Sequence, residues 1–175
     1  DYIAIKNFNI KNEMVFDLFR QTKFDKDKFF LIVGIYSERD SLNIDNVYLS
    51  TIDTKKWVGM LNLEIIEEIR KYEKYVKNKI KNGTMLKKDW DEARNKFDKK
   101  WEKTTPNIIR LRLRAYTDDT ETYVTKIRIQ CAIRYTPFKR YFIEGQEFKT
   151  KRFMTGPKAN LLIPNFLNKY PEIMN

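Results

Sequence analysis

The sequence predicts an α+β fold in which a helical hairpin, at about residues 62–103, is inserted between two groups of strands that form an antiparallel sheet. Apolar residues alternate with polar ones before residue 61. They recur every three or four positions from there to residue 104, and they alternate again after Pro106. A chain of 175 residues has the length of one domain, so we expect a single domain over 1–175 with 61–104 as an inserted lobe.

Short strands are expected before the helical region. Segments 2–10 and 14–19 mix apolar and polar residues in rough alternation. Segment 29–36 is a continuous run of bulky, partly β-branched residues, which is typical of a buried strand. Segments 47–52 and 55–60 complete the group, after a polar stretch rich in turn-forming residues.

The first helix is predicted by a single apolar stripe. Its members recur at steps of three and four residues and are Leu61, Ile65, Ile66, Ile69, Tyr72, Val76 and Ile80. Asn62 is a good N-cap, with glutamates near the positive end of the helix dipole and lysines near its negative end. Asn82 and Gly83 are typical of a helix end, and Thr84 is expected to cap the next helix.

A second stripe predicts the partner helix. It consists of Leu86, Trp90, Ala93, Phe97 and Trp101. The connection between the stripes is very short, so the helices are expected to fold back on each other as an antiparallel pair that ends before Pro106. Their apolar stripes, including the tryptophans, are expected to form a core.

Alternation after Pro106 predicts a β-hairpin. The first strand alternates Ile109, Leu111 and Leu113 with Arg110, Arg112 and Arg114. Residues 117–120 have turn chemistry, and residues 123–135 alternate again. One more strand is expected at about 141–148, and a short helix is expected after Pro164.

Composition restricts the chemistry of the chain. It has 35 Lys and Arg against 24 Asp and Glu, a formal net charge of +11, no His and one Cys. The lack of His excludes most zinc sites, the commonest general base and every Ser-His or Cys-His nucleophile. A single Cys excludes an internal disulfide framework. We therefore expect a protein without catalytic activity, cofactor or metal.

The same composition suggests a location and a class of partner. The longest apolar run, residues 29–36, has the length of a strand, so no membrane span is expected. A disulfide-free chain fits a reducing compartment, so an intracellular location is expected: the cytoplasm, or the nucleus if the source is a eukaryotic host or its virus. The net positive charge favours polyanions, of which nucleic acid is the leading candidate.

The predicted β-hairpin is expected to present a basic surface. Residues two apart in a strand share a face, so pairing of the apolar rows brings the polar rows of both strands together. The expected members of this surface are Arg110, Arg112, Arg114, Tyr116, Lys126, Arg128 and Arg134. Like charges opposite one another destabilise a sheet, so we expect an anion to neutralise them, and arginine suits phosphate.

The segment after the hairpin interleaves rings with cations and is expected to extend this surface. Its candidate nucleic-acid-binding residues are Phe138, Lys139, Arg140, Tyr141, Lys151, Arg152 and Phe153. A positive groove with aromatic faces is the combination that holds single-stranded nucleic acid. Alternatives stay open, because the arginine row can be a solvated strand face and the rings can belong to the core.

These observations predict a non-enzymatic nucleic-acid-binding protein that prefers single-stranded DNA or RNA and has weak sequence specificity. A homo-oligomer is compatible with this role, because such binders often act cooperatively. The alternatives are a viral or phage structural or nucleocapsid assembly protein, and a basic adaptor that binds an acidic protein. A metal-dependent enzyme ranks last: Asp118, Asp119 and Glu121 could hold Mg²⁺, but Asp is expected in a hairpin turn anyway.

Overall fold

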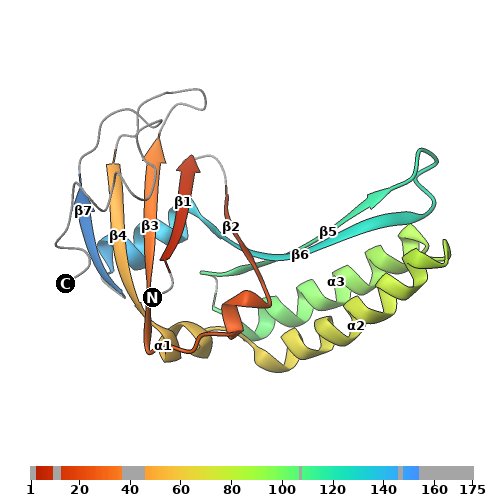
Figure 1. Ribbon diagram of the computed structural model, residues 1–175, viewed down its shortest axis with the longest axis horizontal. Helices are drawn as coiled ribbons and strands as arrows, with labels where there is room; N and C mark the ends of the chain where they lie inside the picture. Colours follow the sequence, from red (N-terminus) through yellow and green to blue (C-terminus); the bar gives the residue numbers. More distant parts are fainter. Residues whose placement is uncertain (1–2, 10–12, 37–45, 107, 146–147, 154–175) are drawn as a thin grey trace. The chain divides into compact units, whose positions relative to one another are not determined.

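The computed structural model describes residues 3–9, 13–36, 46–106, 108–145 and 148–153. The elements follow in the order β1 (Ile3–Asn9), β2 (Glu13–Asp17), the 3₁₀ turn η1 (Arg20–Thr22), β3 (Lys28–Tyr36), β4 (Asn46–Asp53), α1 (Thr54–Gly59), α2 (Leu63–Lys81), α3 (Lys87–Thr104), β5 (Arg110–Thr117), β6 (Val124–Arg134), α4 (Tyr135–Phe138), the π-helix η2 (Lys139–Glu144) and β7 (Lys149–Phe153) (Figure 1). The predicted α+β class, with a helical hairpin between two groups of strands, is confirmed.

The chain folds into two compact units, which we describe separately. The sheet unit consists of Asp1–Met14, Lys26–Thr54 and Arg134–Asn175, and the hairpin unit of Val15–Asp25 and Lys55–Ile133. Compact units of this kind can belong to one domain, so the expectation of a single domain stays a prediction. The predicted helix after Pro164 and all but the last residue of the predicted polar stretch at 37–46 lie outside the described residues.

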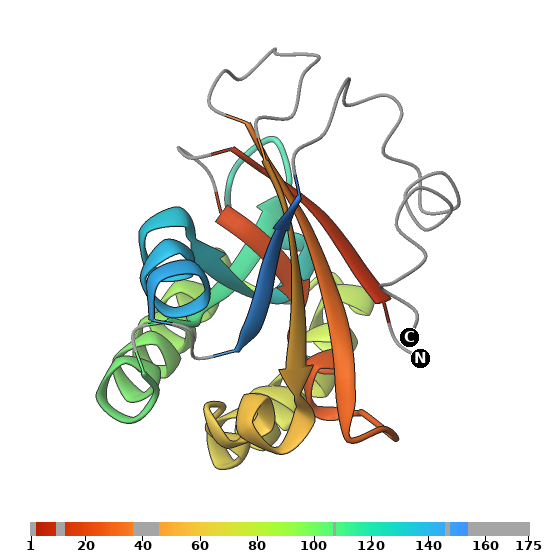
Figure 2. The ribbon, with the colours of Figure 1, turned by 90° about the vertical axis from the view of Figure 1, so that its left-hand side faces the viewer.

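The sheet unit is built on a four-stranded sheet in the order β1-β3-β4-β7 (Figure 2). β3 pairs antiparallel with β4, and β4 pairs antiparallel with β7. β1 instead runs parallel to β3, which differs from the antiparallel pairing that the sequence predicts. The chain can make this parallel pair because β2 and η1 lie between the two strands and provide the long connection that parallel neighbours need.

Aromatic side chains from α4 and η2 form a cluster with the sheet of this unit. The ring centroid of Phe138 lies 6.2 Å from that of Tyr48 on β4 and 4.9 Å from that of Phe142. Phe142 in turn lies 4.8 Å from Phe148, again between ring centroids. Phe138, Phe142 and Phe148 are all buried, so they belong to the core of the sheet unit.

The prediction of a strand at about 141–148 is wrong, because this part of the chain forms the π-helix η2. The helix ends at Gly145, whose N–H donates to the carbonyl oxygen of Arg140 at 2.7 Å. A Cβ at this position would lie only 2.5 Å from the same oxygen, so only glycine fits there without a shift of the backbone. The mixed polar and apolar pattern that suggested a strand comes from a helix with one buried side.

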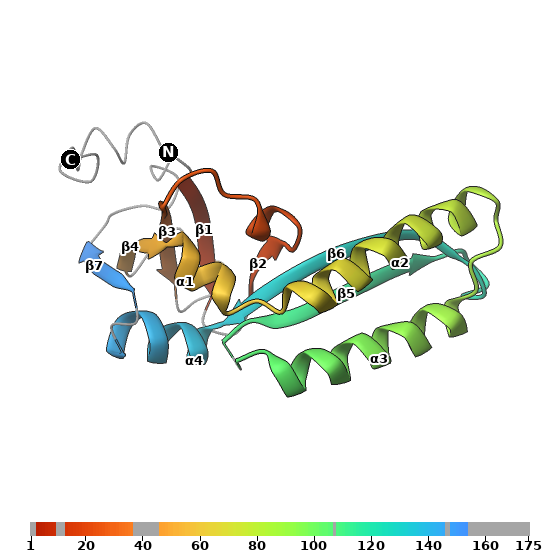
Figure 3. The same ribbon diagram turned by 90° about the horizontal axis from the view of Figure 1, so that it is seen from below.

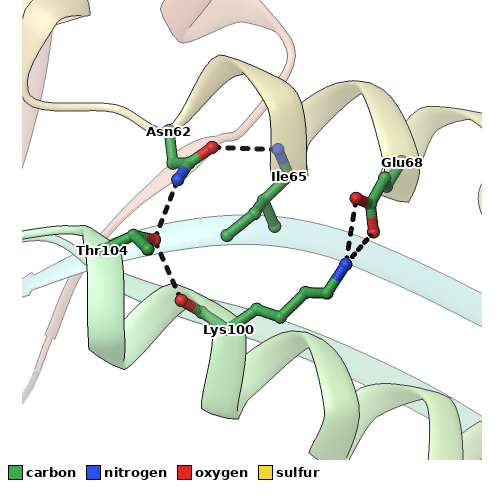
Figure 4. Close-up of polar contacts among 5 residues, drawn as sticks. All are labelled: Asn62, Ile65, Glu68, Lys100 and Thr104. Atoms are coloured by element: carbon green, nitrogen blue, oxygen red, sulfur yellow. Dashed lines mark hydrogen bonds and ion pairs between the residues drawn. The ribbon is translucent and has the colours of Figure 1, made fainter.

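Helices α2 and α3 of the hairpin unit form the predicted pair and are joined at one end by the N-cap of α2 (Figure 4). The side-chain oxygen of Asn62 accepts a hydrogen bond from the Ile65 N–H at 3.0 Å. The Asn62 side-chain nitrogen donates to Thr104 Oγ1 at 2.8 Å. A second link is the ion pair of Lys100 Nζ with Glu68 Oε2 at 2.7 Å. The predicted cap is therefore confirmed, and it also ties α2 to α3.

The predicted end of α2 is confirmed, but two neighbouring predictions are wrong. Gly83 has a φ of +66°, the left-handed conformation that favours glycine after a helix. Thr84 does not cap α3: its hydroxyl donates to the Lys79 carbonyl at 3.3 Å. The prediction of a strand at 55–60 is also wrong, because residues 54–59 form the helix α1, in which Thr54 and Trp57, three residues apart, are both buried.

The core of the hairpin unit is the predicted pair of apolar stripes. Its buried helix residues are Ile65, Ile66, Ile69, Val76, Trp90, Phe97 and Trp101. Trp101 donates from Nε1 to the carbonyl oxygen of Ile109 at 2.9 Å, which connects α3 to the residue before β5. Tyr72 stacks against Trp90, and burial raises the pKa of the Tyr72 hydroxyl to about 12.

The second sheet has the strand order β2-β6-β5. Helix α3 packs on β5, and both views show the two helices running alongside the β5–β6 ribbon (Figures 1 and 3). Each sheet combines strands from before and after the helical hairpin, because β7 joins the first sheet and β2 joins the second. Within the described ranges, no helix is long and apolar enough to cross a membrane.

Candidate nucleic-acid interface

The register of β5 and β6 brings the two apolar rows together, as the sequence predicts. Leu111 pairs with Cys131, and Leu113 pairs with Ile129. All four side chains are buried. Because directly paired residues project to the same side of a sheet, this register also places the two polar rows together on the opposite side.

We call that opposite side the basic face. Its members on the two strands are Arg110, Arg112, Arg114, Tyr116, Lys126, Arg128 and Gln130. Every charged residue within β5 and β6 is Lys or Arg. Most of these side chains are exposed, whereas Arg112 and its partner Gln130 are half-buried. The face is therefore a solvent-accessible strip of one charge sign.

The most unusual pairing on the basic face is Arg114 directly opposite Arg128. Paired residues in an antiparallel ladder have Cα atoms about 4.5–5.5 Å apart, so the two arginine side chains leave the sheet from adjacent positions on one face. Among the described residues, neither arginine forms an ion pair with a carboxylate, and the same holds for Lys126. Like charges at this spacing destabilise the sheet in the absence of an anion.

Tyr116 lies beside this arginine pair and in contact with two cations of β6. Arg128 Cζ lies 5.3 Å from the centroid of the Tyr116 ring, and Lys126 Nζ lies 6.0 Å from it. These are cation–π distances. Tyr116 is nevertheless 40% exposed, which makes it one of the most exposed large apolar residues of the described chain. The group Arg114, Tyr116, Lys126 and Arg128 is called the Tyr116 cluster below.

The other end of the basic face is partly neutralised by the protein itself. Burial raises the pKa of the Asp98 carboxyl on α3, and attraction by Arg94 and Arg110 opposes this rise. Arg110 is therefore close enough to Asp98 to interact with its charge. Arg110 and Arg112 also have interaction partners within the protein. The cations left for an external anion are concentrated in the Tyr116 cluster.

The far end of the β5–β6 hairpin is held by the connection between α2 and α3. Lys87 N–H donates to the Thr122 carbonyl at 2.9 Å, and Val124 N–H donates to the Met85 carbonyl at 2.8 Å. Leu86 and Tyr123 form an isolated β-bridge at the same place. Sequence reasoning missed this link, because main-chain hydrogen bonds leave no pattern of side chains. It fixes the end of the ribbon that carries the Tyr116 cluster.

Asp118, one of the acidic residues at this hairpin turn, stabilises the turn by accepting hydrogen bonds. Asp118 Oδ1 accepts from the N–H groups of Thr122 and Tyr123 at 3.0 and 3.1 Å, and its Oδ2 accepts from the Thr120 hydroxyl at 2.9 Å. The hydrogen bond from Tyr123 is the main cause that lowers the pKa of Asp118. Glu121 has a φ of +54°, which this turn requires. Both carboxylate oxygens of Asp118 therefore accept hydrogen bonds within the turn.

The remaining predicted residues belong to the sheet unit, and Arg134 among them ends strand β6, in the same alternating row as Arg128 and Gln130. Arg134 Nε lies 3.3 Å from Glu13 Oε1, although most of its side chain is exposed. Lys139 is also exposed, and its hydrogen bond with Glu144 at 3.1 Å raises the pKa of the Lys139 ammonium group. Both cations therefore have carboxylate partners of their own.

The prediction that Phe138 stacks on a base is wrong, because its side chain is fully buried. Its ring packs on Tyr48 and Phe142, as α4 and η2 turn it toward the sheet. Arg140 is exposed, and its Cζ lies 5.7 Å from the centroid of the half-buried Tyr141 ring. These two residues form a cation–π contact on η2.

The residues predicted on β7 do not share one face. Lys151 pairs with Leu49, and Arg152 pairs with Tyr48, so the two exposed cations project to opposite sides of the sheet. Phe153 ends β7, and its side chain lies outside the described part of the structure. The sequence interleaving of rings and cations therefore does not correspond to one continuous surface in this segment.

Comparison of the chain with models of protein families, with curated proteins and with solved structures finds no match in any of the three.

Proposed function

We propose that the chain is a non-enzymatic protein that binds nucleic acid, and single strands in preference to duplexes, through the basic face. The observation that carries the proposal is the Tyr116 cluster. It combines two arginines on directly paired positions, a lysine and an exposed ring, and its cations form no ion pair within the described residues. The phosphates of a nucleic acid would neutralise these charges and remove the repulsion between Arg114 and Arg128.

The chemistry of the face supports phosphate binding with weak sequence specificity. Arginine presents a planar fork of donors that matches a phosphate group, and two arginines occupy directly paired positions on the ribbon. Contacts to phosphates position a protein on nucleic acid but carry no sequence information. The exposed ring supports the preference for single strands, because unpaired bases can stack on it.

The proposal is tested by measuring the affinity for a fluorescent single-stranded oligothymidylate between about 50 and 200 mM salt. The test variant combines Arg114→Gln, Lys126→Gln and Arg128→Gln. Loss of three phosphate contacts should make the slope of log K against log salt shallower by about 2. A duplex of the same length and heparin serve as competing ligands, and both should bind more weakly than the single strand.

The matched control removes the same charge from the helices. It combines Lys74→Gln, Lys88→Gln and Lys99→Gln, at exposed positions of α2 and α3. Both variants carry 11 − 3 = +8, so net charge alone would affect them equally. Equal losses of affinity in both variants would contradict a role of the basic face. No binding by the unmodified chain would overturn the proposal altogether.

A further inference from the structure

We infer that Tyr116 is the stacking platform for one unpaired base, and that Arg114 and Arg128 together receive a phosphate next to that base. This inference rests on the proposed function. It goes further by naming the ligand at one position of the basic face: an unpaired nucleotide, recognised by its base as well as by its charge.

The spacing on the ribbon suits one nucleotide. Arg114 precedes Tyr116 by two residues on β5, so their side chains leave the same face about 7 Å apart. Arg128 lies directly opposite Arg114, and Lys126 lies directly opposite Tyr116. A phosphate between the two guanidinium groups is therefore close enough to the ring for an attached base to reach it.

The Tyr116 ring is both ordered and accessible. Arg128 and Lys126 hold it by cation–π contacts at 5.3 and 6.0 Å from its centroid. A ring that is already held in place loses little conformational freedom when a ligand binds, which favours affinity. Since Tyr116 is still 40% exposed, part of its surface remains open to a base.

A base in a duplex cannot use this ring without leaving its stack. Both faces of a paired base are covered by its neighbours, so a duplex would offer the basic face only its phosphates. A single strand offers phosphates and free base faces together. One aromatic residue, Tyr116, is therefore enough to explain why the cluster would prefer single strands.

Tyr75 on α2 provides a matched comparison. It is 52% exposed, and Lys79 Nζ lies 5.7 Å from the centroid of its ring. The ring of Tyr75 is stacked on Tyr72, at 5.9 Å between centroids. An exposed tyrosine with a lysine beside it thus also occurs on a helix, without the opposed arginines that mark the Tyr116 cluster.

The inference is tested with Tyr116→Leu, Tyr116→Phe and Tyr75→Leu, against two ligands of equal length: an oligothymidylate and an abasic deoxyribose-phosphate strand. Tyr116→Leu should weaken binding of the oligothymidylate by about 5- to 150-fold, the range expected for one lost stacked base. Its affinity for the abasic strand should not change. Tyr75→Leu should bind both ligands like the unmodified chain, whereas Tyr116→Phe, which keeps a ring for stacking, should recover the affinity for oligothymidylate that Tyr116→Leu loses.

Photo-cross-linking of the unmodified chain gives a second measurement that needs no variant. An oligonucleotide containing 5-iodouracil should cross-link to Tyr116, as located by mass spectrometry of the digested complex. Cross-links only at other residues would overturn the inference, and so would a Tyr116→Leu variant that binds oligothymidylate normally or loses both ligands equally. In those cases phosphate binding by the basic face would stand. Failure of the unmodified chain to bind either strand would overturn both.

Discussion

Arg114 and Arg128 are the residues at which stability and ligand binding are expected to conflict. They occupy directly paired positions on an exposed strip without acidic residues, so each raises the energy of the other in the free protein. A sheet under selection for stability alone would place a carboxylate or a neutral residue at one of the two positions. Residues that destabilise the free state are common at functional sites.

Replacement of Arg114 by glutamine should therefore stabilise the free protein and weaken its binding. We expect a gain of a few tenths of a kcal/mol in unfolding free energy, from removal of one like-charge pair. The salt dependence of oligothymidylate binding should become shallower by about 0.7, the effect of one phosphate contact to a single strand. Denaturant unfolding and fluorescence titration measure the two quantities.

Arg112→Gln is the control for this prediction. Arg112 faces the neutral Gln130, so its removal relieves no opposed pair of charges, and the stability of the free protein should not rise. A fall in stability on replacing Arg114 would show that its side chain supports the fold, contrary to the role proposed for it.

At the scale of elements, the β5–β6 hairpin is a ribbon fixed at its far end. Main-chain hydrogen bonds join this end to the connection between α2 and α3, and Asp118 organises the turn itself. α3 supports the ribbon by packing on β5. A ribbon fixed in this way presents the Tyr116 cluster with little loss of conformational freedom on binding.

The turn should weaken when Asp118 loses its charge. Because hydrogen bonds lower the pKa of Asp118 in the folded protein, its carboxylate stabilises the turn above the pKa of the unfolded chain. This contribution is lost as the pH falls through the folded pKa. Asp118→Asn should thus reduce the hydrogen-exchange protection of the Thr122 and Tyr123 amides at neutral pH. The difference from the unmodified chain should shrink below about pH 3.8. A constant difference at all pH values would contradict this role of the charge.

At the scale of the whole molecule, positive charge is abundant but unevenly available. The net charge is +11, yet many exposed cations of the helices and of the sheet unit have carboxylate neighbours, among them Lys77, Lys87, Lys100, Arg134 and Lys139. A net positive charge favours polyanions in general, without selecting one surface. The Tyr116 cluster combines an exposed ring with two arginines on directly paired positions.

Nucleic-acid binding by the whole molecule should be nearly independent of pH between about 5.5 and 9. The chain has no His, the side chain whose charge ordinarily changes in this range, and the basic face is built from Arg and Lys. Affinity measured at constant ionic strength across this range checks the prediction. A change of tenfold or more would show that another titrating group takes part in binding.

The sequence by itself determined the buried strand β3, the β5–β6 hairpin with its basic face, and the helical pair, because each depends on a short-range period. Alternation placed Arg114 and Arg128 on one face, and stripes placed Trp90 and Trp101 in the core. A period of two also implies the pairing of the apolar rows, since a shift of the register by one residue would expose one of them.

Only the tertiary structure decided which of the predicted site residues lie at the surface together. Phe138 lies in the core, and Arg110 is close to Asp98 of α3. These facts depend on contacts between segments far apart in the chain, and composition or spacing does not encode them. Sequence patterns report which side chains share a face, whereas burial and charge pairing are set by whatever packs against that face.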